Sequence, residues 1–293
     1  MIPLSFAQRR LWFLHKLEGP SATYNAPLAL RLTGKLDQQA LRTAVLDVVE
    51  RHESLRTVFP EFDGQPQQRV IEPHRVELGW ENPAVTEQAL PEALASAARR
   101  TFDLATEIPI RVWLFDIVDG NSTEDEYVLL VLLHHVVGDG WSMGPLVRDI
   151  VTAYSARSAG RAPALAELPV QYADYTLWQR ELLGDESDPD SVLSQQVAYW
   201  TRQLADLPEQ LSLPTDRPRP AVASYAGATV NFALDAKLHR KLTALAGRNG
   251  ATVFMVLQAG MAALLTRLGA GTDVPLGSGL AGRTDEALDD LIG

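Results

Sequence analysis

Two adjacent histidines end an apolar segment of the chain, and an aspartate between two glycines follows them. The segment LLHHVVGDGW covers residues 132–141 and places His134 and His135 directly after two leucines. Side chains alternate between the two faces of a β-strand, so both imidazoles cannot reach one cleft. We therefore predict that one histidine is packed inside and that the other is presented for acid–base or electrostatic chemistry.

The residues after the histidines have types that could hold such a site in place. Gly138 and Gly140 permit tight backbone geometry and the close approach of a ligand. Asp139 could orient an imidazole, or it could pair with an arginine and hold the turn. Two neighbouring histidines can also be ordinary hydrogen-bonded polar groups, but the pattern HHxxxDG at the end of an apolar segment favours a functional site.

A zinc site is a poor alternative explanation of the two histidines. Adjacent histidines on a strand diverge, and the chain has neither an HExxH pattern nor any cysteine. We expect no metal.

A β-hairpin is predicted to position the histidines. Residues 108–118 and 126–137 are rich in β-branched and aromatic side chains and flank the polar residues 119–126. The second of these strands is apolar on both faces, which predicts an interior strand. Ser142 is predicted to cap a following helix that stops near Gly160.

Strands and helices alternate along the rest of the chain, which predicts an α/β (α+β) fold with a boundary near residue 170. Asp37 is a plausible N-cap of a helix that carries His52 on its apolar face, and Asp63-Gly64 is a plausible hairpin turn. The further predicted elements are helices at 86–102, 194–207, 236–248 and 252–268, strands at 225–234 and 273–279, and a proline-rich connector at 213–222.

Composition excludes several classes of protein. The chain of 293 residues is 46% hydrophobic and has a formal net charge of −11, which argues against a nucleic-acid partner because such proteins need basic faces. No segment approaches the length of a membrane span, and the amino-terminal residues lack the apolar core of a signal peptide. These features and the absence of cysteine favour a cytoplasmic protein.

Four segments, in order, resemble signature motifs of the condensation domains of nonribosomal peptide synthetases. They are LSFAQRRLWFLHKL (4–17), RHESLRTVF (51–59), LLHHVVGDGWS (132–142) and YADYTLWQR (172–180). Residues 273–293 resemble the stretch that leads into the next motif, so the resemblance covers the whole chain. The HHxxxDG pattern alone is less specific, because related acyltransferases such as chloramphenicol acetyltransferase also carry it.

The resemblance implies a V-shaped pseudo-dimer of two chloramphenicol-acetyltransferase-like lobes, with a tunnel between them. Residues 1–170 are expected to form the first lobe and residues 171–293 the start of the second. Because the family's domain continues beyond this point, the second lobe is expected to be truncated.

The resemblance also assigns roles to residues. His135 is implied as the catalytic residue, and the backbone of Gly140 is expected close to the reacting atoms. The structural residues of the site are expected to be His134, Trp141 and Asp139, the last paired with Arg56. Such a pair would keep a carboxylate away from His135. Arg283 and Ser142 are expected to line the substrate tunnel.

The activity implied by the resemblance is amide formation between two carrier-bound thioesters. The amine of an acceptor aminoacyl thioester attacks the carbonyl of a donor acyl or peptidyl thioester, and His135 could accept a proton or stabilise the developing charge. Donor and acceptor peptidyl carrier proteins supply the phosphopantetheine, so the chain needs no bound cofactor. A neighbouring adenylation domain is the other expected partner, in a monomeric part of a multidomain chain.

Three alternative functions remain at this point. A catalytically silent docking module of the same fold would recruit a partner enzyme, but silent relatives tend to lose the HHxxxDG pattern. A stand-alone acyltransferase would use an acyl-CoA, but the motifs at 51–59 and 172–180 favour the synthetase family. Ester formation with a hydroxyl nucleophile is the third.

The RRLWFL opening resembles domains that join an L-configured donor to an L-configured acceptor.

Overall fold

The two strands predicted on either side of the polar segment pair with each other at the centre of the main sheet. In the computed structural model, β8 (Ile110–Ile117) and β9 (Glu126–His134) are antiparallel, which confirms the predicted hairpin. Much of the polar segment, residues 120–124, lies outside the described residues. The structure describes residues 2–119, 125–208, 210–222, 224, 227–228, 230–280, 282–283 and 285–293.

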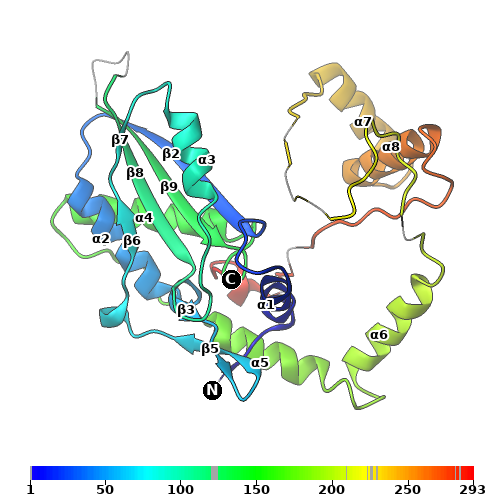
Figure 1. Cartoon of the computed structure of the whole chain (residues 1–293), viewed down its shortest axis with the longest axis horizontal. Coiled ribbons are helices and arrows are strands. Elements are labelled where there is room, and N and C mark those ends of the chain that lie inside the picture. The colour runs from blue at the N-terminus through cyan, green and yellow to red at the C-terminus, as the bar shows by residue number, and fades with distance from the viewer. Residues whose placement is uncertain are drawn as a thin grey trace. The chain divides into compact units, whose positions relative to one another are not determined.

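The main sheet has β9 in its interior. The strand β2 (Asn25–Thr33) pairs antiparallel with β9, and the short strands β6 (Gly79–Glu81) and β7 (Ala84–Val85) pair parallel with β8. All residues of β9 from Tyr127 onward are buried, as predicted for an interior strand. Because β9 has a partner on each side, the backbone at its end is held by both neighbouring strands (Figure 1).

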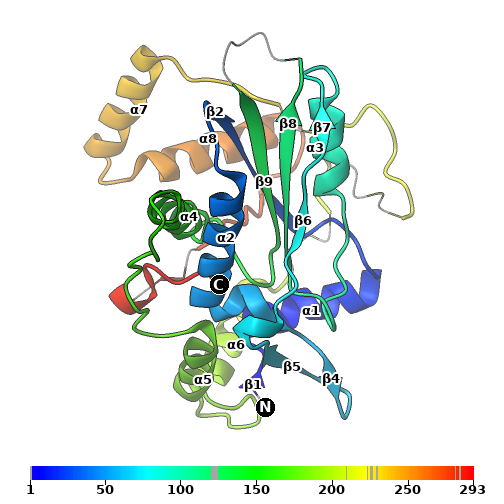
Figure 2. The same ribbon diagram turned by 90° about the vertical axis from the view of Figure 1, so that its left-hand side faces the viewer.

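Helices cover both faces of this sheet. Figure 2 shows α2 and α4 on one face and α3 on the other. The helix α2 is capped by Asp37, whose side chain accepts from the Ala40 N–H, as predicted. Its buried face alternates at helical spacing, with Leu41, Val45 and Val48 almost fully buried. The bounds of these helices are α2 Gln38–Arg51, α3 Leu90–Ala98 and α4 Met143–Ser158.

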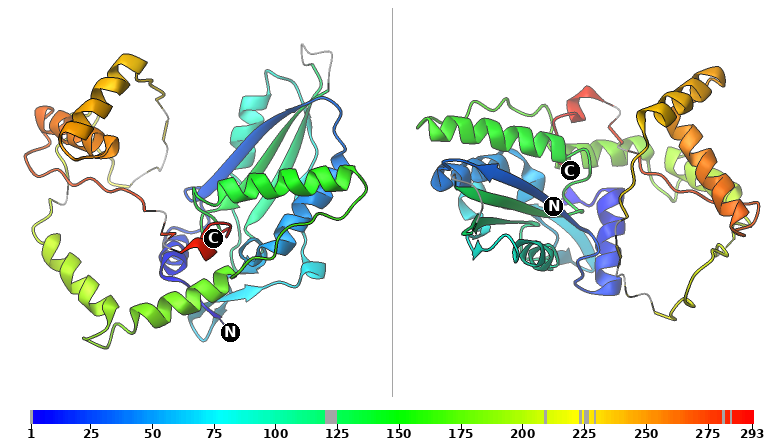
Figure 3. Two further views of the ribbon diagram at one scale, coloured as in Figure 1. Left: turned by 180° about the vertical axis from the view of Figure 1, so that it is seen from behind. Right: turned by 90° about the horizontal axis from the view of Figure 1, so that it is seen from above.

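A second, smaller sheet lies beside the amino-terminal helix α1 (Phe6–Glu18) and α5 (Tyr172–Leu183), as two further views confirm (Figure 3). The predicted turn at Asp63-Gly64 is present, with φ of 48° and 74°, the left-handed geometry of a tight hairpin. The bounds of its strands are β1 Ile2–Pro3, β3 Thr57–Val58, β4 Glu61–Phe62 and β5 Gln65–Val70. Short 3₁₀ helices occur at η1 Glu53–Arg56, η2 Pro73–Arg75 and η3 Glu286–Leu288.

The chain divides into two compact units. Residues 1–193 together with 281–293 form the first, and residues 194–280 form the second. The lobe boundary predicted near residue 170 concerns the complete domain and stays a prediction.

The second unit consists mainly of helices. Besides most of α6 (Val192–Gln203) it contains α7 (Ala236–Arg248) and α8 (Val253–Arg267), which match the prediction closely. Their caps are local: Asp235 accepts from the Leu238 N–H, and Thr252 accepts from the Met255 N–H.

The two strands predicted in the second unit do not form among its described residues. Residues 227–228, 230–234 and 273–279 have no strand conformation. A strand is stable only when another strand pairs with its backbone N–H and C=O groups, and the described part of this unit offers no such partner. The prediction of strands is therefore wrong for these described residues.

No single helix in the described part of the chain is both long and apolar enough to cross a bilayer. The pair α7 and α8, bent by 102° at their junction, meets the criteria of length and composition only when taken together.

Candidate functional site

The strand β9 directs its two terminal histidines to different surroundings. The His134 N–H donates to the Pro109 carbonyl at 3.0 Å, and the His135 N–H donates to the Tyr24 carbonyl at 2.8 Å. His134 is 2% exposed, whereas His135 is exposed. The structure thus has one histidine packed and one presented, and the presented one is His135. Its catalytic role stays a prediction.

His134 is a packed, neutral group. Its Nδ1 accepts a hydrogen bond from the Val136 N–H at 3.1 Å, so this nitrogen carries no proton. The rings of His15, Tyr24 and Phe102 lie 6.1–6.4 Å from it, centroid to centroid. Burial lowers the pKa of His134 from 6.5 to about 4, with smaller contributions from His15 and His135. His134 therefore fixes the chain next to His135 rather than exchanging protons at neutral pH.

This buried histidine predicts a loss of stability in acid. The unfolded chain binds a proton at His134 below about pH 6.5, whereas the folded chain binds it only near pH 4. The stabilisation is therefore present above pH 6.5 and is lost as the pH falls towards 4. In the variant His134→Asn, whose amide oxygen can still accept from the Val136 N–H, the loss between pH 7.5 and 5.0 should shrink by about 1–2 kcal/mol.

Urea unfolding of both proteins at the two pH values measures this difference. His52 is present in both proteins, so its own titration cancels in the comparison. An equal loss in parent and variant would contradict the assignment.

Asp139 and Ser142 close the turn after the histidines. The Asp139 Oδ1 accepts from the Ser142 N–H at 2.9 Å and from the Ser142 hydroxyl at 2.7 Å, while the Asp139 N–H donates to the Ser142 Oγ at 3.1 Å. The predicted capping of α4 by the Ser142 side chain is wrong, because this hydroxyl serves the turn instead. Ser142 does occupy the N-cap position of α4, but with helical backbone angles, φ −56° and ψ −25°, in place of the usual extended ones.

The arginine that reaches Asp139 is Arg283, not Arg56. The Arg283 Nη2 lies 3.5 Å from the Asp139 Oδ1 and donates to the Gly293 carbonyl at 2.8 Å, and its side chain is 7% exposed. The predicted pair of Asp139 with Arg56 is therefore wrong.

The Arg56 guanidinium is hydrogen-bonded to groups near its own segment. It donates to the carbonyls of Glu50 at 3.3 Å and Ile71 at 2.8 Å, and to the Glu53 carboxylate at 3.5 Å. These contacts hold the segment between α2 and β5, so the guanidinium stays away from the turn.

The two glycines of the turn have different roles. Neither has a positive φ, so backbone freedom does not explain them. A Cβ at Gly138 would lie 3.2 Å from the Leu133 Cδ1, whereas a Cβ at Gly140 would meet nothing within 4 Å. Gly138 therefore serves packing. The open space at Gly140 agrees with the prediction that a ligand can approach it, which itself stays a prediction.

The segment 285–293 lies against this turn, a contact that no pattern in the sequence predicted. The half-exposed Trp141 donates from Nε1 to the Asp289 carbonyl at 3.1 Å. The Ser54 hydroxyl donates to the Ile292 carbonyl at 2.6 Å, and Ile292 is fully buried. These two contacts, and that of Arg283 with Asp139, connect residues more than 140 positions apart, which no local pattern could reveal.

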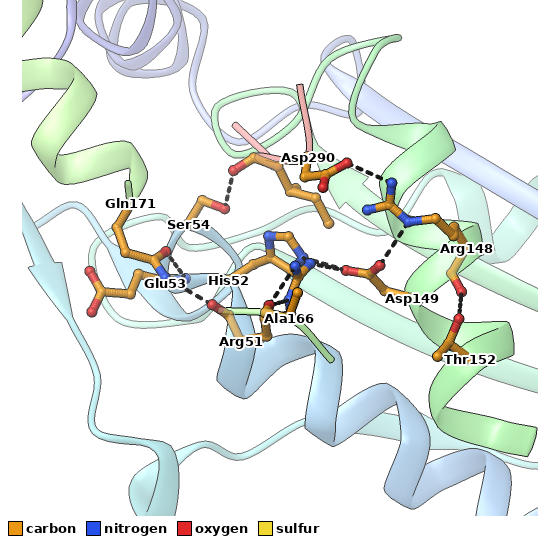
Figure 4. A network of polar contacts seen from close by, with 11 residues as sticks. Arg51, His52, Glu53, Ser54, Arg148, Asp149, Thr152, Ala166, Gln171 and Asp290 are labelled. Carbon is orange, nitrogen blue, oxygen red and sulfur yellow. Dashed lines mark hydrogen bonds and ion pairs between the residues drawn. The ribbon is translucent and has the colours of Figure 1, made fainter. Parts of the chain in front are cut away.

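A buried polar network joins α2 to α4 (Figure 4). The His52 Nε2 lies 2.8 Å from the Asp149 Oδ2, Arg51 pairs with the same carboxylate, and Arg148 links Asp149 to Asp290. Burial lowers the pKa of His52. Burial alone would raise the pKa of Asp149, but the hydrogen bond from His52 and the charge of Arg51 outweigh it and lower that pKa.

The network supports α2 and α4 behind the turn rather than forming a second reactive site, because His52 is fully buried. His52 was predicted on the apolar face of its helix, and its full burial agrees with that prediction. Asp149 was missed. The available signal was an aspartate on the apolar face of a helix, next to Leu146 and Ile150.

Among the described residues there is no group of three or more His, Asp or Glu side chains placed to hold a metal ion. A hollow of about 490 Å³ lies along β6 and β8. None of the residues that line it is a predicted site residue. This hollow is therefore not the candidate site. The presented His135 and the supported turn locate it.

The family model described as Condensation domain matches residues 1–293 of the chain. The chain is 62% identical over 293 residues to the probable non-canonical nonribosomal peptide synthetase CymA of Salinispora arenicola (strain CNS-205), with all of the chain and 4% of the synthetase covered. It is 56% identical over 292 residues to the dimodular nonribosomal peptide synthase of Bacillus subtilis (strain 168), with coverages of 100% and 12%.

Among solved structures, the fold is similar to the X-domain seen in complex with OxyB from teicoplanin biosynthesis. The TM-score is 0.86 at 36% sequence identity, and the match covers 100% of this chain and 63% of that chain. The chain thus spans a small part of the two curated synthetases and less than two thirds of the X-domain chain.

Proposed function

The chain belongs to the condensation-domain family of nonribosomal peptide synthetases, and on that premise we propose that it carries the histidine side of an amide-forming site. In this proposal the substrates are a donor acyl or peptidyl thioester and an acceptor aminoacyl thioester, each held on the phosphopantetheine of a carrier protein. The chain itself binds no cofactor. Its partners are the two carrier proteins and an adenylation domain of a multidomain synthetase in the cytoplasm.

The proposed reaction is a single transfer. The acceptor amine attacks the donor carbonyl carbon, a C–N bond forms, and the C–S bond to the donor phosphopantetheine breaks. The amine loses a proton and the departing thiolate gains one, so atoms and charge balance. A thioester is already activated, so correct placement of the amine supplies much of the acceleration.

The observation that carries this proposal is the exposure of His135 at the end of a rigid interior strand. Its backbone is held by the Tyr24 carbonyl, its neighbour His134 is packed, and the turn after it is held by Asp139, Ser142 and Arg283. A presented imidazole on a fixed backbone can face an attacking amine and accept its proton or stabilise the developing charge. We assign that role to His135 and a structural role to His134.

One observation favours a second candidate, a docking module. The structural likeness to the X-domain is high, and that protein was solved in complex with OxyB. The intact histidines, aspartate and glycine of residues 134–140 support catalysis instead, since a docking surface has no need of a presented histidine beside a supported turn.

The form of the donor substrate tests the proposal. The chain, within the synthetase that contains it, receives equal concentrations of one acyl donor as a carrier thioester and as a CoA thioester, with the acceptor carrier loaded. We expect transfer from the carrier-bound donor and little from the CoA-bound donor, because tethering supplies a high effective concentration. Equal transfer from both forms would favour a stand-alone acyltransferase, and ester formation with a hydroxyl acceptor alone would contradict an amide-forming site.

A further inference from the structure

A hollow of about 350 Å³ lies among the start of α1, the strand β5 and the end of α5, and two arginines line it. Arg9 comes from α1 and Arg180 from α5, and Gln65 and Gln67 of β5 are the other polar residues of the lining. None of the lining residues is acidic. Figure 2 shows α1, α5, β1 and β5 gathered at this end of the first unit.

Arg180 is held in place. Its Nε donates to the carbonyl of the buried Leu4 at 2.9 Å, and its guanidinium lies over the Phe6 ring, 5.4 Å from the ring centroid. Both contacts leave the terminal Nη groups without a partner in the described part of the chain. A guanidinium fixed in this way loses little further freedom when it binds a ligand.

Arg9 adds a second positive charge without a counter-charge. It is exposed, and over the described residues no carboxylate lies within ion-pair distance of either Arg9 or Arg180. Burial lowers the pKa of Arg180, and the neighbouring positive charge of Arg9 lowers it further. The amino-terminal end of α1 also contributes positive potential to this hollow.

This local excess of positive charge lies in a chain whose formal net charge is −11. Other arginines of the first unit, such as Arg31, Arg111 and Arg157, form ion pairs with nearby carboxylates, whereas Arg9 and Arg180 share one hollow that has no acidic residue in its lining. A pair of unneutralised guanidinium groups at one hollow is therefore a candidate anion site, since a bound anion would remove their mutual repulsion.

We propose that this hollow binds a phosphate group through the guanidinium groups of Arg9 and Arg180. A tetrahedral phosphate offers several acceptor oxygens, so it can accept from two guanidinium groups that approach from different helices, and planar N–H donors suit its geometry. The amide groups of Gln65 and Gln67 can donate to remaining oxygens.

Two sources share this chemistry, namely free phosphate and the phosphate of a phosphopantetheine-bearing ligand. The site is separate from His135, so its test does not depend on the proposed amide formation. The two sources are distinguished by comparing inorganic phosphate, 4′-phosphopantetheine and pantetheine as ligands.

The experiment is a phosphorus NMR titration of inorganic phosphate with the parent protein and with Arg9→Gln. We expect binding to the parent, weakened about tenfold in the variant, because one charge-assisted contact is lost at a partly exposed site. Arg10→Gln is the matched control, since Arg10 is the next residue of α1, is also exposed and does not line the hollow. It should bind phosphate within about twofold of the parent if direct contact, rather than general charge, is responsible.

A second variant and two further ligands complete the test. Arg180→Lys keeps the charge but loses the planar fork, and should weaken binding with the fold intact by circular dichroism. Tighter binding of 4′-phosphopantetheine than of phosphate would identify the pantetheine arm as the source, and equal binding would identify free phosphate. No binding to the parent, equal weakening in Arg9→Gln and Arg10→Gln, or binding of pantetheine as tight as that of 4′-phosphopantetheine would overturn the proposal.

Discussion

Replacing His135 by alanine is expected to slow amide formation by about 10²- to 10⁴-fold, the usual contribution of one positioned acid–base group. The exposed side chain makes no hydrogen bond in the described structure that its loss would break, so the fold should persist. Single-turnover transfer between loaded carriers measures the rate of the chemical step. His74→Ala is the matched control, because His74 is an exposed histidine of η2 outside the site and its loss should change the rate less than about twofold.

A second variant separates the two roles that His135 could have. Glutamine can donate a hydrogen bond to a developing charge but cannot accept a proton at neutral pH. If His135 is a base, His135→Gln should be as slow as His135→Ala. If it stabilises charge, the glutamine variant should retain much of the activity. A rate within threefold of the parent for both variants would remove His135 from the mechanism.

Replacing Arg283 by alanine is expected to reduce both stability and transfer. The change removes contacts to Asp139, Ser142 and the Gly293 carbonyl, and a nearly buried side chain cannot be replaced there by water without rearrangement. The Asp139 carboxylate is partly exposed and the ion pair is long, so we expect a loss of about 1–3 kcal/mol in the free energy of unfolding. Urea unfolding measures it, with Arg161→Ala as an exposed control.

The Arg283→Ala variant should slow transfer in the way expected for the loss of a positioning residue. Its loss frees the turn that follows His135, so kcat should fall while KM for the acceptor carrier changes little, and Arg283→Lys should restore part of the rate.

A double-mutant cycle tests which arginine supports Asp139. Asp139→Asn combined with Arg283→Ala should show a coupling of at least about 0.5 kcal/mol in unfolding free energy, whereas Asp139→Asn combined with Arg56→Ala should be additive. Strong coupling to Arg56 and none to Arg283 would show that the pairing at the turn is wrong.

The parts of the fold that the sequence predicted well are those determined by local patterns. The hairpin β8–β9 follows from two apolar β-rich stretches on either side of a polar one, and the predicted cap Asp37 accepts from the N–H of Ala40, three residues further on. The strands predicted at 225–234 and 273–279 do not form over the described residues of those ranges, because a strand depends on a pairing partner that a local pattern cannot supply.

In the candidate site, too, the features set by local patterns were predicted and those set by distant partners were not. Strand alternation predicted that His134 and His135 would face different surroundings, and they do. The partner of Asp139 could not be predicted this way, because Arg283 is 144 positions away in the sequence while Arg56 is held by carbonyls close to it. Ser142 looked like a helix cap, yet its hydroxyl is engaged by Asp139, a competition that only the folded turn reveals.

The measurement that tests the central claim most directly is intact-protein mass spectrometry of the two carriers in the transfer assay. With donor and acceptor carriers loaded, we predict that the acceptor carrier gains the mass of the donor acyl group while the donor carrier returns to its unloaded holo mass. The same mixture with His135→Ala should show this gain only after a much longer time. Loaded carriers that keep their masses in the presence of the folded synthetase would contradict the proposal that this chain helps to form an amide bond.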